Sequence, residues 1–294
     1  MKVVMPKVYF VGYQEINLDE VHAYLRDSGN IEFWNQLAEA RKEGVSGAEI
    51  LCSMFAKLCY KSLRLGANCN VTKVRDIEDN LAAILSQGHG SVLEHVNLNF
   101  LVTNCSRVFT HEMVRHRVGT AFSQTSGRYC RIQDLEMVFD PILNDAREEL
   151  AEIVKVVETN VRKAEIKLGL RDLDGEVTVR DFGYKKKVTS ALRRFSLNGA
   201  SNEIAVSLNI RALRHTLMVR TAESAEWEIR EVFGQIYQLV KNRYEYLFSD
   251  ATFKDGVVSG MKLQPYEKSA TMLLDEMNDD ELRVYLETRP SRHT

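Results

Sequence analysis

The order in which strand and helix patterns follow one another constrains the fold of this chain most. Residues 7–13 (KVYFVGY) and the alternating segments 95–102 and 203–209 are typical of β-strands. Most of the intervening residues have helical periodicity, and helices are expected over 17–27, 31–43, 48–64, 74–86, 105–116, 141–169, 186–195, 210–222 and 224–247. Because strands and helices do not alternate regularly, the pattern predicts an α+β fold, a mixed sheet with flanking long helices, rather than a doubly wound sheet.

Several local signals refine this pattern. The helix over 224–247 presents a continuous apolar face, with Ile229, Val232, Phe233, Ile236, Tyr237 and Val240 at helical spacing. The helix over 48–64 places Ile50, Leu51, Met54, Leu58 and Leu65 near the same spacing, and Gly88 is a signal for the end of the preceding 74–86 helix. Residues 88–95 are expected to form a turn, 118–127 a loop, and 128–132 a short strand. No repeat or linker divides the chain, so one domain over 1–294 is expected, with an amphipathic stretch at 269–288 in a polar tail.

Composition excludes several classes of protein. No apolar run of the 294-residue chain approaches the ~18 residues of a membrane span. The first residues lack the long apolar region of a signal peptide and are interpreted as the first strand. The cysteines are odd in number and lack CxxC spacing, which favours free thiols in a reducing cytoplasm over disulfides or a zinc ribbon: Cys52, Cys59, Cys69, Cys105 and Cys130.

Basic residues concentrate in two segments of a chain whose net charge is −2. Residues 105–131 contain five arginines against one acid, and residues 185–220 contain eight Lys/Arg against one acid, so the remainder is strongly acidic. This distribution indicates a local anion site. A nucleic-acid coat normally raises the charge of the whole domain.

The densest polar segment is 115–129, RHRVGTAFSQTSGRY. Arginine side chains bind phosphate oxygens in a bidentate manner, and hydroxyls and loop N–H groups can complete such a site. Gly119 and Gly127 allow the backbone to approach a ligand closely. The segment therefore predicts a phosphate- or nucleotide-binding loop, with a polar loop at a helix C-terminus as the alternative.

Two further segments carry candidate ligands. In NIRALRH (209–215), Arg211 and His215 share one helical face, whereas Leu213 and Leu217 share another that can be core. GHGSVLEH (88–95) contains two histidines and a carboxylate, but its spacing favours a turn over a metal site, and no metal is expected. The common glycine-rich nucleotide motifs and the hydrolase motifs are absent from the sequence.

Together these segments resemble the flavin-dependent thymidylate synthases. The signature of that family is an Arg-His-Arg triplet followed by a loop ending in Ser-x-Arg-Tyr, here RHR (115–117) and SGRY (126–129). GHGSVLEH, NIRALRH, Arg220 and AEWEIR (225–230) add support in the same order. The resemblance covers about 48–247 and leaves 1–47 and 248–294 as extensions of unassigned role. Eight residues here separate the triplet from Ser126, one more than is usual in the family.

The resemblance implies a homotetramer whose sites combine residues of different subunits, and two sets of ligands. The implied ligands of the pyrimidine nucleotide dUMP are Glu112, Arg115, Gln124, Ser126, Gly127, Arg128, Arg193 and Arg220, although Arg194 stands beside Arg193. The implied FAD ligands are His89, Ser91, Arg115, His116, Arg117, Asn209, Arg211 and His215.

The implied reaction is the reductive methylation of dUMP to dTMP, with methylenetetrahydrofolate as one-carbon donor and NADPH as reductant of FAD. Arg220 is the candidate catalytic residue, because an arginine near the uracil carbonyls can stabilise developing negative charge. Ser126 is expected to bind substrate, since its loop offers no neighbouring base, and Cys130 is expected to be a packed thiol. A pyrimidine hydroxymethyltransferase and a non-enzymatic single-stranded nucleic-acid binder are the alternatives. The second would need more aromatic side chains among the arginines than Phe122 and Tyr129.

Overall fold

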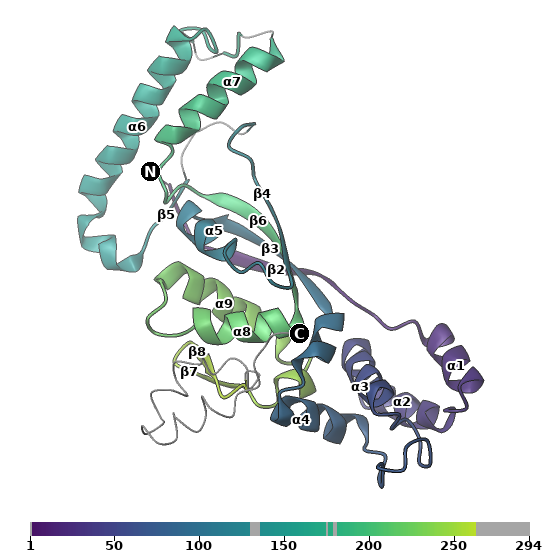
Figure 1. The fold of residues 1–294 in the computed structure, drawn as a ribbon. Helices are drawn as coiled ribbons and strands as arrows, with labels where there is room; N and C mark the ends of the chain where they lie inside the picture. Colours follow the sequence, from purple (N-terminus) through teal and green to yellow (C-terminus); the bar gives the residue numbers. More distant parts are fainter. Residues whose placement is uncertain (1, 130–135, 175, 179–180, 263–294) are drawn as a thin grey trace, which may run out of the picture.

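A computed structural model describes residues 2–129, 136–174, 176–178 and 181–262. Its centre is a four-stranded sheet in the order β2 (Lys7–Tyr13), β3 (Asn97–Cys105), β6 (Asn202–Asn209) and β4 (Thr120–Gln124) (Figure 1). Every neighbouring pair in this sheet is antiparallel. The α+β class is confirmed, but the expectation of a mixed sheet is wrong for these four strands. The parallel pairing among the described residues is a separate ladder of β1 (Lys2–Val4) with β5 (Glu136–Val138).

The two predicted central strands bury one face of the sheet. Alternate residues of β3 (Leu98, Phe100, Val102) and of β6 (Ile204, Val206, Leu208) are buried, as the period of two requires. Helices α8 (Ile210–Arg220) and α9 (Trp227–Val240) contribute to the same core. All six predicted core residues of α9 are buried, as are Leu213 and Leu217 of α8. This packing fixes α8 at the end of β6, which it follows directly.

Four helices precede β3 in the sequence: α1 (Leu18–Asp27), α2 (Glu32–Lys42), α3 (Gly47–Cys59) and α4 (Ile77–Gln87). A capping box between Ser46 and Glu49 begins α3, and Gly88, with φ of +69°, ends α4. The predicted helix over 48–64 is too long, because α3 stops at Cys59 and both Leu58 and Leu65 are exposed. The turn at 88–95 contains a 3-10 helix, η1 (Gly90–His95).

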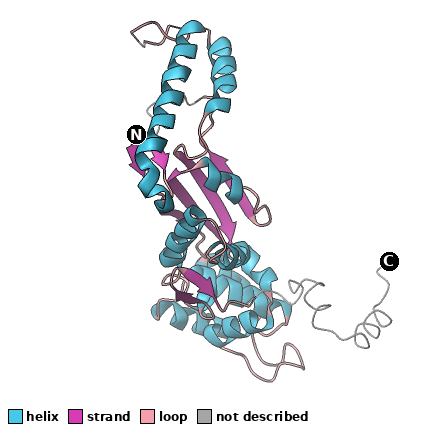
Figure 2. Ribbon diagram, turned by 90° about the vertical axis from the view of Figure 1, so that its left-hand side faces the viewer, coloured by secondary structure: helices cyan, strands magenta, loops and turns pink. Residues whose placement is uncertain are grey.

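A helical arm projects from one end of the molecule (Figures 1 and 2). It consists of η2 (Pro141–Ala146), α6 (Arg147–Lys167), α7 (Phe182–Leu192) and η3 (Arg193–Phe195). More than half of the surface of Ile153, Val156, Phe182 and Phe195 is exposed. The arm therefore leaves apolar side chains uncovered in a single copy of the chain.

The chain around the signature loop differs from expectation. Residues 118–127 were expected to be a loop, but five of them form β4 because their backbone pairs with β6. Arg128 and Tyr129 lie in a turn rather than in the predicted 128–132 strand, whose remaining residues, with Cys130, lie outside the described part. Helix α5 (Arg107–Met113) is shorter than the predicted 105–116 segment.

The carboxyl-terminal part holds η4 (Tyr246–Phe248) and a hairpin of β7 (Thr252–Lys254) with β8 (Val257–Ser259), which the sequence did not predict. Val258 of this hairpin and Val8 of β2 belong to the same hydrophobic core as α9. The 269–288 stretch lies outside the described residues. Within the described residues, no helix is long and apolar enough to cross a membrane.

Candidate functional site

Helix α5 is anchored at its amino terminus by a buried acid. Ser106 caps the helix, its Oγ accepting a 3.1 Å hydrogen bond from the Phe109 N–H. Glu228 of α9 accepts a 2.6 Å bond from the Ser106 N–H and a second bond from the Ser106 hydroxyl. Burial raises the pKa of Glu228 to about 7, although both bonds from Ser106 oppose the shift. The start of α5 is thus fixed to the helix packed beneath the sheet.

The Arg-His-Arg triplet follows directly after α5. Arg115 and Arg117 are exposed, whereas His116 is half-buried. Arg220, the last residue of α8, donates from Nε to His116 Nε2 (2.7 Å) and from Nη1 to Glu112 Oε2 (2.8 Å). Glu112, His116 and Arg220, predicted to serve two different ligands, therefore form one hydrogen-bonded cluster.

The surroundings of His116 keep its imidazole neutral. Burial is the largest cause that lowers its pKa to about 4, followed by the charge of Arg220 and by His215. Since Arg220 donates to Nε2, that nitrogen acts as the acceptor. At neutral pH the imidazole can therefore orient Arg220 without competing for an anion.

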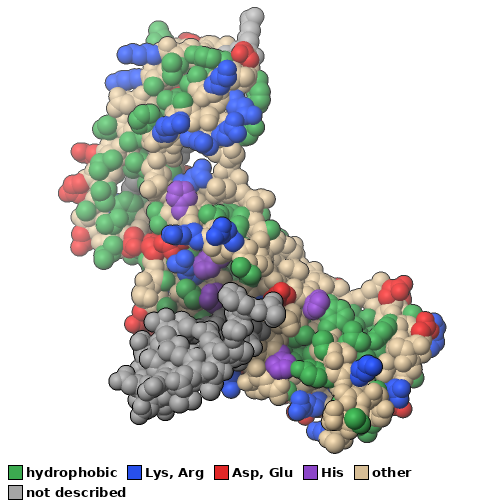
Figure 3. Space-filling model, in the orientation of Figure 1, with side chains coloured by type: hydrophobic (Ala, Val, Ile, Leu, Met, Phe, Trp, Pro, Cys, Tyr) green, Lys and Arg blue, Asp and Glu red, His purple; other side chains and the backbone are tan. Residues whose placement is uncertain are grey.

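A pocket of about 400 Å³ lies between the triplet and the amino-terminal turns of α8. Asn209 caps α8 by accepting a 2.8 Å bond from the Ala212 N–H, and Arg211 and His215 follow on one face. Six of the eight predicted flavin ligands line this pocket: Arg115, His116, Arg117, Asn209, Arg211 and His215. Lys, Arg and His side chains gather near α5 on the face drawn in Figure 3. Two segments about 90 residues apart in sequence thus build one basic cavity.

The approach of the signature loop to α8 depends on a glycine. Gly119 has φ of +68°, and the Asn209 N–H donates a 2.9 Å bond to its carbonyl. A Cβ at Gly119 would lie 2.8 Å from Asn209 Cγ. A side chain at this position would therefore displace the cap of α8 as well as strain the backbone.

Two polar features of this pocket bear on what it can bind. Glu94, the carboxylate of the GHGSVLEH segment, lines the pocket and forms an ion pair with Arg211. The buried Nδ1 of His215 has no hydrogen-bond partner among the described residues. A buried ring nitrogen without a partner is costly, so a ligand with polar groups fits the cavity.

His89 and Ser91 lie elsewhere in a single chain. His89 precedes η1, and its Nδ1 lies 3.1 Å from the Tyr60 hydroxyl on the border of a different pocket. Ser91 is exposed in η1. The described residues contain no group of three or more side chains suited to a metal ion.

The second half of the signature lies at the far end of β4. Ser126 Oγ accepts a 3.3 Å bond from the Arg128 N–H, and the Tyr129 N–H donates 3.0 Å to the Ser126 carbonyl. A Cβ at Gly127 would lie 3.7 Å from Arg193 Cβ and 3.2 Å from Arg107 Nη2. Ser126, Gly127, Arg128 and Arg193 thus come together, with Gln124 exposed on the preceding strand.

Two contributors to this turn, Arg107 and helix α7, were not predicted from the sequence. Arg107, at the start of α5, was counted among the basic residues but was given no role. Tyr129 stacks on Phe182 of α7 with ring centroids 6.4 Å apart, and Lys186 of α7 lies 4.8 Å from the Tyr129 ring. The arm therefore fixes the signature turn. Only the tertiary structure brings α7 to it.

The extended strand β4 separates the two groups of predicted nucleotide ligands. Its five residues span roughly 17 Å at the usual rise per residue of a strand. Glu112 and Arg115 precede it in the sequence, and Arg220 of α8 is bonded to Glu112, whereas Ser126 and Arg128 follow it. The strand thus separates the two groups along the chain, although Arg107 of α5, the helix that also contains Glu112, approaches Gly127.

Residues 43–244 match the model of the family described as thymidylate synthase complementing protein. The chain is 33% identical over 172 residues to a flavin-dependent thymidylate synthase of Thermococcus onnurineus, covering 57% of this chain and 64% of that protein. It is 30% identical over 230 residues to the Mycobacteroides abscessus enzyme of the same name, covering 75% and 88%. The chain spans slightly less than two thirds of the first of these relatives.

A solved structure is also similar in part. Thymidylate synthase X from Helicobacter pylori, solved with FAD and dUMP, aligns with a TM-score of 0.46 and 19% identity over 69% of this chain and 93% of that one.

Proposed function

The chain belongs to the family of thymidylate synthase complementing proteins, the flavin-dependent thymidylate synthases, and on that premise we propose that it reductively methylates dUMP to dTMP with methylenetetrahydrofolate and NADPH. The observation that carries the proposal is the pocket between the signature triplet and α8. Its side chains come from two distant segments and are the ones the resemblance assigns to the flavin.

The residues of this pocket fit FAD. The unpartnered His215 Nδ1 needs a polar group, and basic side chains of the triplet suit phosphate oxygens. Arg115, His116, Arg117, Asn209, Arg211 and His215 would hold the cofactor, with His89 and Ser91 completing the set. When bound and reduced, FAD supplies the hydride. The chain itself binds, orients and shields the reactants.

Arg220 is the proposed catalytic residue. Its Nε and Nη1 are engaged by His116 and Glu112, so the plane of the guanidinium is fixed. A fixed cation costs little reorganisation when negative charge develops on a uracil carbonyl. The neutral His116 positions this cation without adding charge of its own, while the Glu112 carboxylate balances part of the arginine's charge.

Ser126 is proposed to bind dUMP rather than attack it. No described hydrogen bond joins its Oγ to a histidine, lysine or carboxylate, whereas Oγ accepts from the Arg128 N–H. Gln124, Gly127, Arg128 and Arg193 would act beside it on the same nucleotide, together with Glu112, Arg115 and Arg220.

We further propose a cytoplasmic homotetramer with shared sites. The placement of the ligand groups on either side of β4 supports this assembly, because a second subunit would then contribute to each site. The apolar side chains of the α6–α7 arm offer surface for such contacts.

The test is direct. Purified protein is expected to show flavin absorbance and to convert dUMP to dTMP in the presence of methylenetetrahydrofolate and NADPH, with the product identified by mass spectrometry. A product heavier by one oxygen would assign a hydroxymethyltransferase instead. Protein that stays colourless after FAD is added would refute the flavin assignment and reopen nucleic-acid binding.

A further inference from the structure

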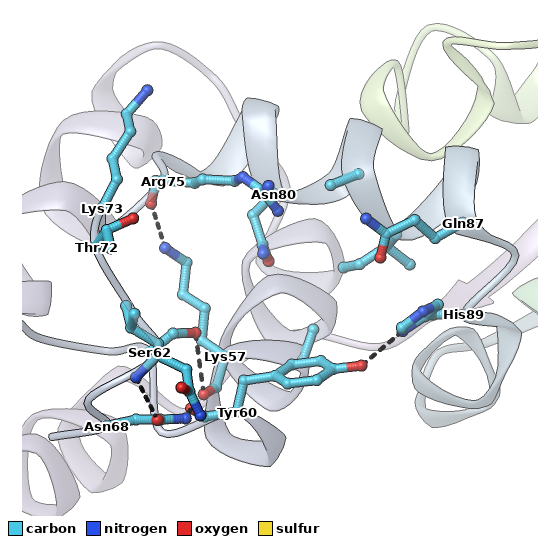
Figure 4. Close-up of a pocket in the computed structure, with 15 residues that line it drawn as sticks. Lys57, Tyr60, Ser62, Asn68, Thr72, Lys73, Arg75, Asn80, Gln87 and His89 are labelled. Carbon is cyan, nitrogen blue, oxygen red and sulfur yellow. Dashed lines mark hydrogen bonds between the residues drawn. The ribbon is translucent and has the colours of Figure 1, made fainter.

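A second cavity, of about 410 Å³, lies between α3, the segment that follows it and α4 (Figure 4). Lys57, Lys73 and Arg75 line it, and its remaining polar lining consists of amides, hydroxyls and His89. None of the described residues that line it is acidic. Such a lining selects an anion with several hydrogen-bonding groups.

The Lys57 ammonium is buried in the wall of this cavity. Lys57 is 1% exposed, and its ammonium donates to the Arg75 carbonyl and lies 5.2 Å from the centroid of the Phe33 ring. Figure 4 shows the Lys57 side chain crossing the cavity toward that carbonyl. An ammonium has three donors, and the described hydrogen bonds use one. The charge of Asp76 also acts on this ammonium, and an anionic group in the cavity would add to its coordination.

The exposed bases at the rim remain available. Lys73 Nζ lies 3.5 Å from Asp79 Oδ2, but both side chains are more than half exposed, so this ion pair is weak. Arg75 immediately precedes Asp76, the cap of α4, and also lines the cavity. A ligand anion can therefore recruit both side chains at little cost.

This cavity borders the flavin pocket through η1. His89, with Tyr60 bonded to its Nδ1, stands at one end of the cavity, and η1 begins at the next residue. Glu94, near the other end of η1, lines the flavin pocket. Six residues of 3-10 helix span roughly 12 Å, so an elongated molecule can reach both cavities.

We propose that the cavity between α3 and α4 holds the anionic end of a co-substrate, the carboxylates of the folate or the phosphates of NADPH, while its reactive end lies at the flavin. The assignment rests on the proposed function and adds a subsite to it. Lys57, Lys73 and Arg75 are the ligands of the anion, and the Tyr60–His89 pair marks the passage toward the flavin.

The test is calorimetric titration of the FAD-loaded protein with p-aminobenzoylglutamate and, separately, with 2′,5′-ADP. A double variant, Lys73→Gln with Arg75→Gln, removes the two rim charges and keeps the Arg75 carbonyl that anchors Lys57. Lys57→Met removes the buried charge. Arg64→Gln is the matched control, since Arg64 is an exposed base of the same segment outside the cavity lining.

One fragment is expected to bind the wild type and to lose roughly fivefold or more in affinity in the double variant, with the control unchanged. The fragment that responds identifies the folate or NADPH as the source of the anion. The proposal is overturned if neither fragment binds, or if the double variant binds as the control does. Because binding needs no turnover, a protein that binds the fragment through these residues but makes no dTMP would refute the proposed reaction alone.

Discussion

At the scale of single residues, Arg220 and His116 act as a pair. Replacing Arg220 by alanine is expected to abolish dTMP formation while most FAD binding remains, since Arg220 does not line the flavin pocket. Loss of its charge should also raise the pKa of His116 above about 4, with burial keeping it below 6.5. The exposed neighbour variant Arg117→Gln is the control for the NMR titration of His116. Loss of FAD with dUMP binding intact would reverse the assignment of Arg220.

Gly119 tests the close approach of the signature loop to α8. Gly119→Ala is expected to cost about 2 kcal/mol or more of unfolding free energy and to weaken FAD binding, because both backbone strain and the collision with Asn209 act there. Gly29 has φ of +69° with no atom within 4 Å of its hypothetical Cβ. Gly29→Ala should therefore cost only about 1 kcal/mol and leave FAD absorbance unchanged. Equal effects of the two variants would show that the approach to Asn209 is unimportant.

Ser126 and Ser123 test the register of the longer loop. If Ser126 only hydrogen-bonds the nucleotide, Ser126→Ala should weaken dUMP binding by about 1–3 kcal/mol with turnover retained at saturation. Ser123→Ala should have little effect, because Ser123 pairs with Ala205 within β4 and does not belong to the turn that holds Ser126 and Arg128. Steady-state kinetics of both variants show which serine contacts dUMP. Folded, yellow Ser126→Ala protein without any product would instead identify a nucleophile.

At the scale of elements, the junction of α5 with α9 depends on Glu228. The pKa of this carboxyl is raised from 4.5 to about 7, so the folded protein holds a proton that the unfolded chain releases between these values. Its contribution to stability is therefore fully present below pH 4.5 and is lost as the pH rises through 7.

Comparison with Glu228→Gln isolates this contribution. The difference in unfolding free energy between the wild type and the variant should fall by about 3 kcal/mol when the pH is raised from below 4.5 to above 7. Chemical denaturation across this range measures it. His116 has the opposite dependence, since stability falls as the pH drops from 6.5 toward 4, but it is present in both proteins and cancels. If the unfolding free energies of the two proteins changed in parallel with pH, Glu228 would titrate normally.

At the scale of the whole molecule, the division of the site along β4 predicts complementation between subunits. Arg128→Ala alters the turn after β4, whereas His215→Ala alters the α8 pocket near the start of β4, and each variant should be inactive. The two variants are mixed in equal amounts under dissociating conditions and reassembled. If each site draws Arg128 and His215 from different subunits, random assortment should leave about a quarter of the sites with both residues intact. Activity assays and light scattering on the mixture measure this. A mixture as inactive as its parents, although it forms mixed tetramers, would place each site within one chain.

The sequence by itself determined the elements whose partners are local or strongly periodic. The apolar face of α9, the alternation of β3 and β6, and the stop of α4 at Gly88 all follow from residue spacing. The family resemblance also implied six flavin ligands, which the tertiary structure brings into one pocket from two segments about 90 residues apart. The face of α9, the alternation of the strands and the stop of α4 depend on neighbours along the chain, which the sequence contains.

Only the tertiary structure decided features whose partners are distant. Residues 120–124 are polar enough to predict a loop, but pairing with β6 makes them a strand. Helix α3 ends before Leu65, which no core element covers. The pairing of Arg220 with His116, and the contact of Tyr129 with α7, join residues 104 and 53 positions apart. Such contacts depend on how the sheet, helices and arm pack together, and packing is set by the whole chain rather than by the residues beside each site.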